Sequence, residues 1–269
     1  MTDQMKHRLG RLVGGVRDLL FPPRCVGCDE LLPPFEGTIF CPMCRTAWEA
    51  ARTRARHTQA TATDSHPLYL VPYRSGHTTG VPERLIYNIK HQGDYRVFRF
   101  VAATLSPSVQ NAFFRLCADV GTDDTTPPLV TYAPRRPAAV RADGFDQAAR
   151  LAKALAKEIG GEYAPLLRRR KRLTSEQKHL NTEGRRKNAT HAYALRRNAA
   201  LRVPGRVIIL CDDVSTTGAT FSACEELLLS AGAVAVLRVS IACTEGTPPN
   251  KSPFKKKRSN AEQQNRQPM

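Results

Sequence analysis

The sequence has no apolar run that approaches the ~20 residues needed to cross a membrane. Residues 9–21 also lack the long apolar core and the small-residue cleavage site of a signal peptide. Acidic residues are scarce, since 24 Asp and Glu stand against 41 Lys and Arg and leave a formal net charge of +17. These absences predict a cytoplasmic protein without a membrane span that is attracted to polyanions such as phosphates or nucleic acid.

Interleaved aromatic residues are missing from the two most basic stretches. Residues 168–187 contain nine Lys and Arg against two Glu, and residues 251–269 contain six against one. With Phe254 as their single aromatic residue, these stretches offer nucleic acid only a salt-dependent contact without base preference. A solvated charged surface is the alternative interpretation.

Disulfides are not expected for the eight cysteines of a chain in a reducing cytosol. Four lie among apolar neighbours and are typical of small buried side chains: Cys117, Cys211, Cys224 and Cys243. The other four are paired by spacing: Cys25, Cys28, Cys41 and Cys44. Four thiolates leave no open coordination position, so this module predicts a structural Zn²⁺ site. An iron–sulfur cluster is the alternative, but its usual spacing is absent.

Apolar periodicity and turn signals predict helices that alternate with strands. The expected helices cover residues 3–20, 82–93, 95–118 (interrupted at Ser106-Pro107), 145–159 and 221–231. The expected strands cover residues 68–73, 129–133, 206–211 and 234–242. Residues 50–66 indicate a linker or a frayed helix end, and residues 247–269 a disordered basic tail. This alternation predicts an α/β fold with a parallel sheet.

The most informative stretch runs from Val207 to Thr220. Its apolar run predicts a buried strand that ends at two adjacent acids, Asp212 and Asp213, before a loop of small and hydroxyl residues. A helix follows and stops at Gly232. N–H groups at the start of that helix favour a phosphate, and the two carboxylates can accept hydrogen bonds from vicinal hydroxyls. A ligand with both a phosphate and a ribose diol satisfies both features.

Two acids followed by Thr-Thr-Gly-x-Thr resemble the phosphoribosyl pyrophosphate (PRPP) signature of type I phosphoribosyltransferases. A buried strand with an ordinary polar turn is the alternative. The resemblance implies that the 5′-phosphate of PRPP is held by five loop residues: Thr216, Thr217, Gly218, Ala219 and Thr220. It also implies that Asp212 and Asp213 hold the ribose hydroxyls.

Further motifs occur in a fixed order along residues 20–245. After the four-cysteine module come Lys90-His91-Gln92-Gly93, Arg141 with Gly144-Phe145-Asp146-Gln147, Thr174-x2-Gln177, Arg185 and Arg186 with Asn188, and the loop of Asp212 to Gly218. This combination is similar to the ComF family of phosphoribosyltransferase-like proteins, whose members include competence proteins for DNA uptake.

The resemblance implies a type I phosphoribosyltransferase fold, with a mainly parallel sheet flanked by helices and a small N-terminal zinc module. It divides the chain into residues 1–66 (helix, zinc module and linker), 67–246 (phosphoribosyltransferase-like domain) and 247–269 (tail). It implies that PRPP is bound with Mg²⁺ and that the pyrophosphate lies near the loop after Ala133. The cations assigned to the ligand are Lys90, Arg135, Arg136 and, in the basic segment 168–188 that corresponds to a mobile lid, Arg185.

The sequence departs from the family at two acids. Asp143 and Asp146 replace the Arg and Asn of the usual Arg-Gly-Phe-Asn-Gln, and acidic capping of a helix is the other interpretation of this segment. Hypoxanthine-type enzymes carry a general-base Asp where Thr216 stands, so base-assisted attack by a 6-oxopurine is not expected.

Two classes of function follow from the resemblance. The first is a pentosyl glycosyltransferase that transfers or hydrolyses the phosphoribosyl group, with Asp212, Asp213 and Arg185 as its catalytic residues. The second is a non-catalytic module in DNA uptake that senses PRPP or a nucleotide, or that binds single-stranded DNA and partner proteins.

Overall fold

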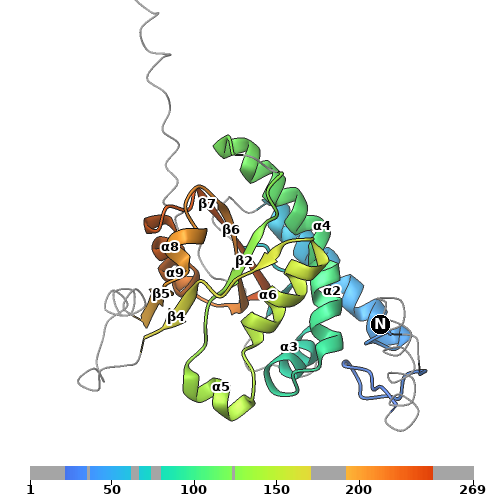
Figure 1. The fold of residues 1–269 in the computed structure, drawn as a ribbon. Coiled ribbons are helices and arrows are strands. Elements are labelled where there is room, and N and C mark those ends of the chain that lie inside the picture. The colour runs from blue at the N-terminus through green and yellow to red at the C-terminus, as the bar shows by residue number, and fades with distance from the viewer. Residues whose placement is uncertain are drawn as a thin grey trace, which may run out of the picture.

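The computed structural model describes residues 22–34, 37–61, 67–73, 80–122, 125–170 and 192–244 (Figure 1). Several predicted features lie outside these residues: the helix at 3–20, the basic segment from 171 onward with Arg185, and the tail at 247–269. Within the described ranges, no helix is both long and apolar enough to span a membrane.

The centre of the fold is a five-stranded sheet in the order β1-β7-β6-β2-β3. Every neighbouring pair in it is parallel, as the alternation of helices and strands predicts. The strands are β1 (Val71–Tyr73), β2 (Leu129–Tyr132), β3 (Glu162–Tyr163), β6 (Val207–Ser215) and β7 (Ala235–Thr244). Because the strands are parallel, their carboxyl ends meet along one edge, where ligands bind in open α/β sheets.

Side chains of β6 alternate between two hydrophobic clusters, one on each face of the sheet. Val207, Ile209 and Cys211 belong to the first cluster, and Ile208 and Leu210 to the second. All five are buried, which is expected for a central parallel strand covered on both faces.

The first cluster lies beneath four helices: α2 (Pro42–Thr61), α3 (Val81–His91), α4 (Tyr95–Val120) and α6 (Gln147–Glu158) (Figure 1). The second lies beneath α8 (Ala199–Arg202), α9 (Ala219–Ser230) and a separate two-stranded sheet. That sheet pairs β4 (Leu167–Arg169) with β5 (Tyr193–Leu195) in antiparallel orientation. The result is a three-layer α/β/α arrangement.

The four-cysteine module packs against the first cluster through its aromatic residues. The Trp48 ring in α2 lies 5.6 Å from the ring of Phe40 and 5.9 Å from the ring of Phe100 in α4. Trp48 is fully buried, and Phe40 directly precedes the second cysteine pair. The module therefore shares its buried side chains with the helices that cover the sheet.

Residues 50–61 form the second half of α2, which agrees with the helical alternative for this stretch and not with a linker. One detail of the predicted elements is wrong. Helix α4 continues through Pro107, although an interruption was predicted there. Leu105, Val109 and Phe113 are buried on both sides of the proline, so packing on the sheet outweighs the hydrogen bond that proline removes.

Short elements escaped prediction altogether. They are α5 (Pro137–Asp143), α8, β3, β4 and β5, which contain two to seven residues each. Such lengths are too short to show a helical or strand period.

Candidate functional site

The loop after β6 forms a pocket at the carboxyl edge of the sheet. Residues 212 and 214–221 line it. Gly218 adopts φ 70° and caps the N-terminus of α9, whose first residue is Ala219. The Ala219 N–H donates to the Thr217 hydroxyl over 3.4 Å. The pocket therefore combines the hydroxyls of Ser215, Thr216, Thr217 and Thr220 with the positive end of a 12-residue helix.

Asp212 and Asp213 are the acids nearest to this loop in sequence, and both lie within β6. Asp212 Oδ1 accepts the Asp213 N–H (2.9 Å), and Asp213 Oδ1 accepts the Val214 N–H (2.8 Å). Burial raises the pKa of Asp212 well above its ordinary value, and the charge of Asp213 raises it further. Asp212 therefore takes up a proton more readily than an ordinary aspartate, because removal from water disfavours its charged form.

A third carboxylate, Asp146, belongs to the same edge. It caps α6 by accepting the Ala149 N–H (3.2 Å), which confirms the capping interpretation of this acid. It also accepts the Arg135 N–H (3.0 Å) from the loop after β2. Burial raises the pKa of Asp146, and the charge of Asp213 adds to the shift. Tertiary structure thus brings Asp146 close to the adjacent acids Asp212 and Asp213, which lie far from it in the sequence.

The two arginines after β2 differ in their surroundings. The Arg135 guanidinium pairs with Asp143, with 2.8 Å between Nη1 and Oδ2, and each side chain is 28% exposed. Arg136 is exposed at the N-cap of α5. The Ala133 N–H donates to the Cys211 carbonyl (2.9 Å), so this loop lies directly beside the acids of β6.

Lys90 lies in the last turn of α3. Its Nζ lies 5.3 Å from the centre of the Tyr73 ring, and its carbonyl accepts a hydrogen bond from Gln147 Nε2 (2.9 Å). Gly93 carries φ 62°, and a Cβ there would come within 2.6 Å of the Phe145 ring. The segments 90–93 and 144–147 therefore hold each other in place.

Arg169 and Tyr193 connect the small sheet to the loop. Sequence reasoning included Arg169 only as part of the basic segment 168–188 and missed Tyr193. Arg169 Nη1 donates to the Tyr193 hydroxyl (2.7 Å), and its guanidinium lies 4.8 Å from the centre of the Tyr193 ring. Burial raises the pKa of Tyr193, while Arg169 and a hydrogen bond with Thr220 oppose the shift. No sequence signal predicts that these two side chains meet, because β4 and β5 are each three residues long and were not predicted as strands.

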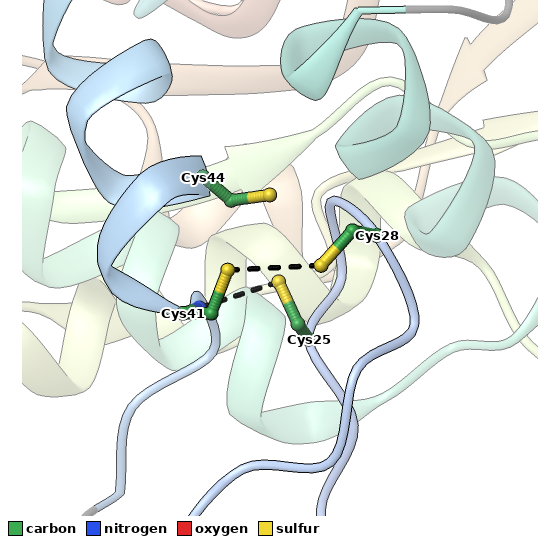
Figure 2. Close-up of side chains that lie close together, drawn as sticks. All are labelled: Cys25, Cys28, Cys41 and Cys44. Atoms are coloured by element: carbon green, nitrogen blue, oxygen red, sulfur yellow. Dashed lines mark hydrogen bonds between the residues drawn. The ribbon is translucent and has the colours of Figure 1, made fainter.

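The second candidate site is the four-cysteine cluster, which Figure 2 shows with the sulfurs converging between a turn and the start of α2. The four sulfurs lie within 4.8 Å of one another, with 3.6 Å between those of Cys28 and Cys41. Thiolates about 2.3 Å from a tetrahedral zinc lie about 3.8 Å apart, so this spacing fits the metal. All four cysteines are free of disulfides.

Backbone groups prepare one of these cysteines as a ligand. Burial raises the pKa of the Cys25 thiol, but N–H groups of Cys41, Cys28 and Gly27 stabilise its thiolate and lower the pKa to about 7. Burial raises the pKa of Cys44. A Cβ on Gly27 would come within 2.6 Å of the Cys44 sulfur, so a glycine is required beneath the cluster. The cluster is compatible with a structural zinc ion, as predicted.

Comparison with known proteins adds the following. No protein-family model matches the chain. The DNA utilization protein YhgH of Salmonella typhi is 36% identical over 93 residues, which are 35% of this chain and 39% of that protein. YhgH of Salmonella typhimurium matches equally.

Solved structures that align include two hypoxanthine phosphoribosyltransferases. The alignment with the enzyme from Staphylococcus aureus has a TM-score of 0.34 and 11% identity. It covers 58% of this chain and 67% of the enzyme's chain. The alignment with the enzyme from Trypanosoma cruzi has a TM-score of 0.35 and 10% identity, and it covers 58% of this chain and 69% of the enzyme's chain.

The protein is of the α/β class, with helices on both faces of a parallel sheet and a four-cysteine module at its N-terminal side. The mainly parallel sheet flanked by helices is as predicted. The DNA utilization protein among the relatives and the convergence of the four cysteines in space fit the predicted resemblance to the ComF family. The chain spans 39% of the length of that relative.

Proposed function

We propose that the protein binds a ligand with a 5-phosphoribosyl group. If the protein is an enzyme, that ligand is PRPP together with Mg²⁺. The observation that carries this proposal is the loop of residues 216–220. Gly218 turns the chain at φ 70° into the N-terminus of α9, directly after two acids at the end of a central strand. That combination suits a phosphate on the helix side and a diol on the strand side.

The proposed roles follow from position. The hydroxyls and N–H groups of Thr216 to Thr220 hold the 5′-phosphate, and Asp212 and Asp213 accept hydrogen bonds from the ribose hydroxyls. Lys90, Arg135 and Arg136 lie on the side where a pyrophosphate group would leave, and bound Mg²⁺ would neutralise the charge that develops there. Arg185 completes this set, although it lies outside the described residues.

As an enzyme, the protein would be a phosphoribosyltransferase that transfers the ribosyl group to an acceptor or to water. Loss of pyrophosphate leaves oxocarbenium character at the anomeric carbon, which the nearby carboxylates stabilise. Thr216 has no basic side chain at neutral pH, so an acceptor must arrive as a nucleophile that needs no base from this position.

The second candidate is a binding module in DNA uptake that acts in the cytoplasm. The relatives are DNA utilization proteins, and the net charge of this chain is +17; both facts favour this candidate. A polyanion such as single-stranded DNA would then bind with an affinity that falls steeply with salt. For either function, we infer that zinc on the four cysteines is structural.

Calorimetry with PRPP and Mg²⁺ tests the ligand proposal. Asp213→Asn keeps the shape of the side chain but loses the charge, so it should weaken binding about 10- to 100-fold. Deoxyribose analogues should bind less well than ribose compounds, and Asp213→Asn should reduce that preference. If PRPP does not bind the wild type at millimolar concentration, the ligand proposal is wrong.

Pyrophosphate release separates the two functions. PRPP with a panel of bases and amines should yield pyrophosphate if the protein is an enzyme. A parallel titration of single-stranded DNA over a series of salt concentrations examines the binding module. Release without an acceptor would indicate hydrolysis, and DNA binding with no release from any mixture would favour the second candidate.

A further inference from the structure

Two carboxylates of the same chain contact Arg135 in the loop after β2. Arg135 offers a backbone N–H and a guanidinium at the edge where the pyrophosphate of PRPP is proposed to lie. Asp146 accepts the N–H (3.0 Å), and Asp143 accepts the guanidinium Nη1 (2.8 Å). The guanidinium–carboxylate contact has the length of a charge-assisted hydrogen bond. Both of these donors are therefore engaged with carboxylates of the same chain.

Asp143 carries a negative charge at neutral pH, as a diphosphate does. Its hydrogen bond with Arg135 lowers the pKa of Asp143, and the nearby His91 acts in the same direction. A diphosphate that approaches Arg135 must displace this carboxylate or share the guanidinium with it. It also meets the partly buried Asp146, which lies near Asp213. Lys90 and exposed Arg136 supply positive charge on this side, but neither replaces the guanidinium at Arg135.

We propose that Asp143 is a specificity residue, an internal counter-ion that occupies Arg135 and limits the affinity for a diphosphate. The site then takes 5-phosphoribosyl monophosphates, such as ribose 5-phosphate and nucleoside 5′-monophosphates, nearly as well as PRPP. This inference rests on the proposed function for its ligand class. The loop of residues 216–220 retains its hold on the 5′-phosphate, whereas the Arg135 side adds little affinity.

Titrations of three ligands into Asp143→Asn and wild type test the proposal. The ligands are PRPP with Mg²⁺, ribose 5-phosphate, and inorganic pyrophosphate with Mg²⁺. Freeing the guanidinium should tighten PRPP and pyrophosphate about tenfold and leave ribose 5-phosphate unchanged, because only the diphosphates reach Arg135. The gain should vanish when Arg135→Gln is added to Asp143→Asn.

Glu162→Gln provides a matched control. Glu162 pairs with Arg202, so this change also frees an arginine and removes one negative charge. Glu162 begins β3 and pairs in register with Leu129 at the start of β2, which places it at the opposite edge of the sheet. Its substitution should leave all three affinities unchanged. A gain equal to that of Asp143→Asn would show a general charge effect and overturn the proposal.

The outcomes separate the two proposals. Failure of the wild type to bind ribose 5-phosphate or PRPP contradicts the proposed function, while the pyrophosphate titration still reports on Asp143. Unchanged or weaker pyrophosphate binding in Asp143→Asn, with a melting temperature like that of wild type, overturns the counter-ion role. Weaker binding would mean that Asp143 orients Arg135 toward the ligand instead of competing with it.

Discussion

At the scale of single residues, Gly218 decides whether the candidate loop can hold a phosphate. Its φ of 70° is a conformation that β-branched side chains rarely adopt, and a side chain there would also obstruct the approach of an oxyanion to the helix N-terminus. Gly218→Val should therefore weaken the binding of ribose 5-phosphate and of PRPP alike. The loss should be on the order of 100-fold or more, because the anion site itself is lost. Calorimetry measures both.

Gly205→Val is the control for backbone strain. Gly205 has φ 73°, and no atom lies within 4 Å of the Cβ that a side chain would add. It should lower the melting temperature about as much as Gly218→Val does but leave both affinities unchanged. Equal loss of affinity in the two variants would attribute the effect to strain rather than to the loop.

Asp212 ties ligand binding to the pH dependence of stability. Its pKa is raised in the folded protein, so it contributes stability below the ordinary carboxyl pKa that is lost as the pH rises through the raised value. Asp212→Asn should raise the melting temperature at pH 8, change it little at pH 4, and weaken ligand binding. Thermal denaturation across this pH range checks the first two effects.

Asp143→Asn should change the melting temperature at pH 8 in the opposite direction to Asp212→Asn. Arg135 lowers the pKa of Asp143, so the carboxylate contributes stability at neutral pH that is lost as the pH falls through the lowered value. This substitution should lower the melting temperature at pH 8, but only slightly, because solvent screens the charges of a partly exposed pair. If both variants changed the melting temperature at pH 8 in the same direction, the pKa shift assigned to Asp212 or to Asp143 would be wrong.

Residues of the site were predictable where they are contiguous. Asp212 to Thr220 form one segment, and one strand–loop–helix unit places all of them except Asp213 in a common pocket. Asp146, Arg169 and Tyr193 were not recognised as neighbours of this loop because only the sheet order and the packing of β5 bring them there. The partner of Arg135 was missed for the same reason, although Asp143 was noted as unusual.

At the scale of elements, a buried ion pair joins α9 to β7. Arg238 and Glu225 form it, with 9% and 5% of their side chains exposed. Burial raises the pKa of Glu225, and Arg238 counters this shift. Glu225→Ala leaves an unpaired buried guanidinium and should cost about 3–5 kcal/mol of stability, as measured by chemical denaturation.

Two comparisons delimit this prediction. The double variant Glu225→Leu with Arg238→Met should recover most of the loss, because apolar side chains replace both charges. Glu49→Ala breaks the pair with Arg52, in which Glu49 is 55% exposed, and should change stability by less than ~1 kcal/mol. A mild effect of Glu225→Ala would show that water reaches Arg238.

Helix α4 shows why some elements could not be predicted from sequence. Asp94 caps its N-terminus and Gly121, at φ 66°, ends it, and both signals are local. Pro107 is also a local signal, but the sheet beneath holds the helix together across it. The sequence therefore predicted the start of α4 correctly and its end, expected at residue 118, two residues too early. Its middle was predicted wrongly, because tertiary packing decides it.

At the scale of the whole molecule, the metal should hold the cysteine module against the sheet-covering helices. We expect one zinc per chain, released by a chelator at acid pH because thiolates must be deprotonated to bind it. Phe40 precedes Cys41 and contacts Trp48, the single tryptophan of the chain. Metal loss should expose Trp48 and shift its fluorescence to longer wavelength.

Two cysteine variants control this experiment. Cys41→Ser should abolish zinc binding and give the shifted emission without a chelator. Cys117→Ala, a substitution of a buried cysteine in α4, should retain the full zinc content. Metal analysis that finds no zinc, together with four freely reactive thiols in the module, would disprove the site.

The pairing of β1 with β7 has a consequence for biosynthesis. Val71 is in register with Ala242, roughly 170 residues later in the chain. At translation rates of about 5–20 residues per second, β1 waits roughly 10–30 s for its partner. The cysteine module needs only neighbours within about 20 residues and can close early. A nascent chain that stops before Ala235 leaves both β1 and the open edge of β6 unpaired, and so presents two strand edges to chaperones or to other chains.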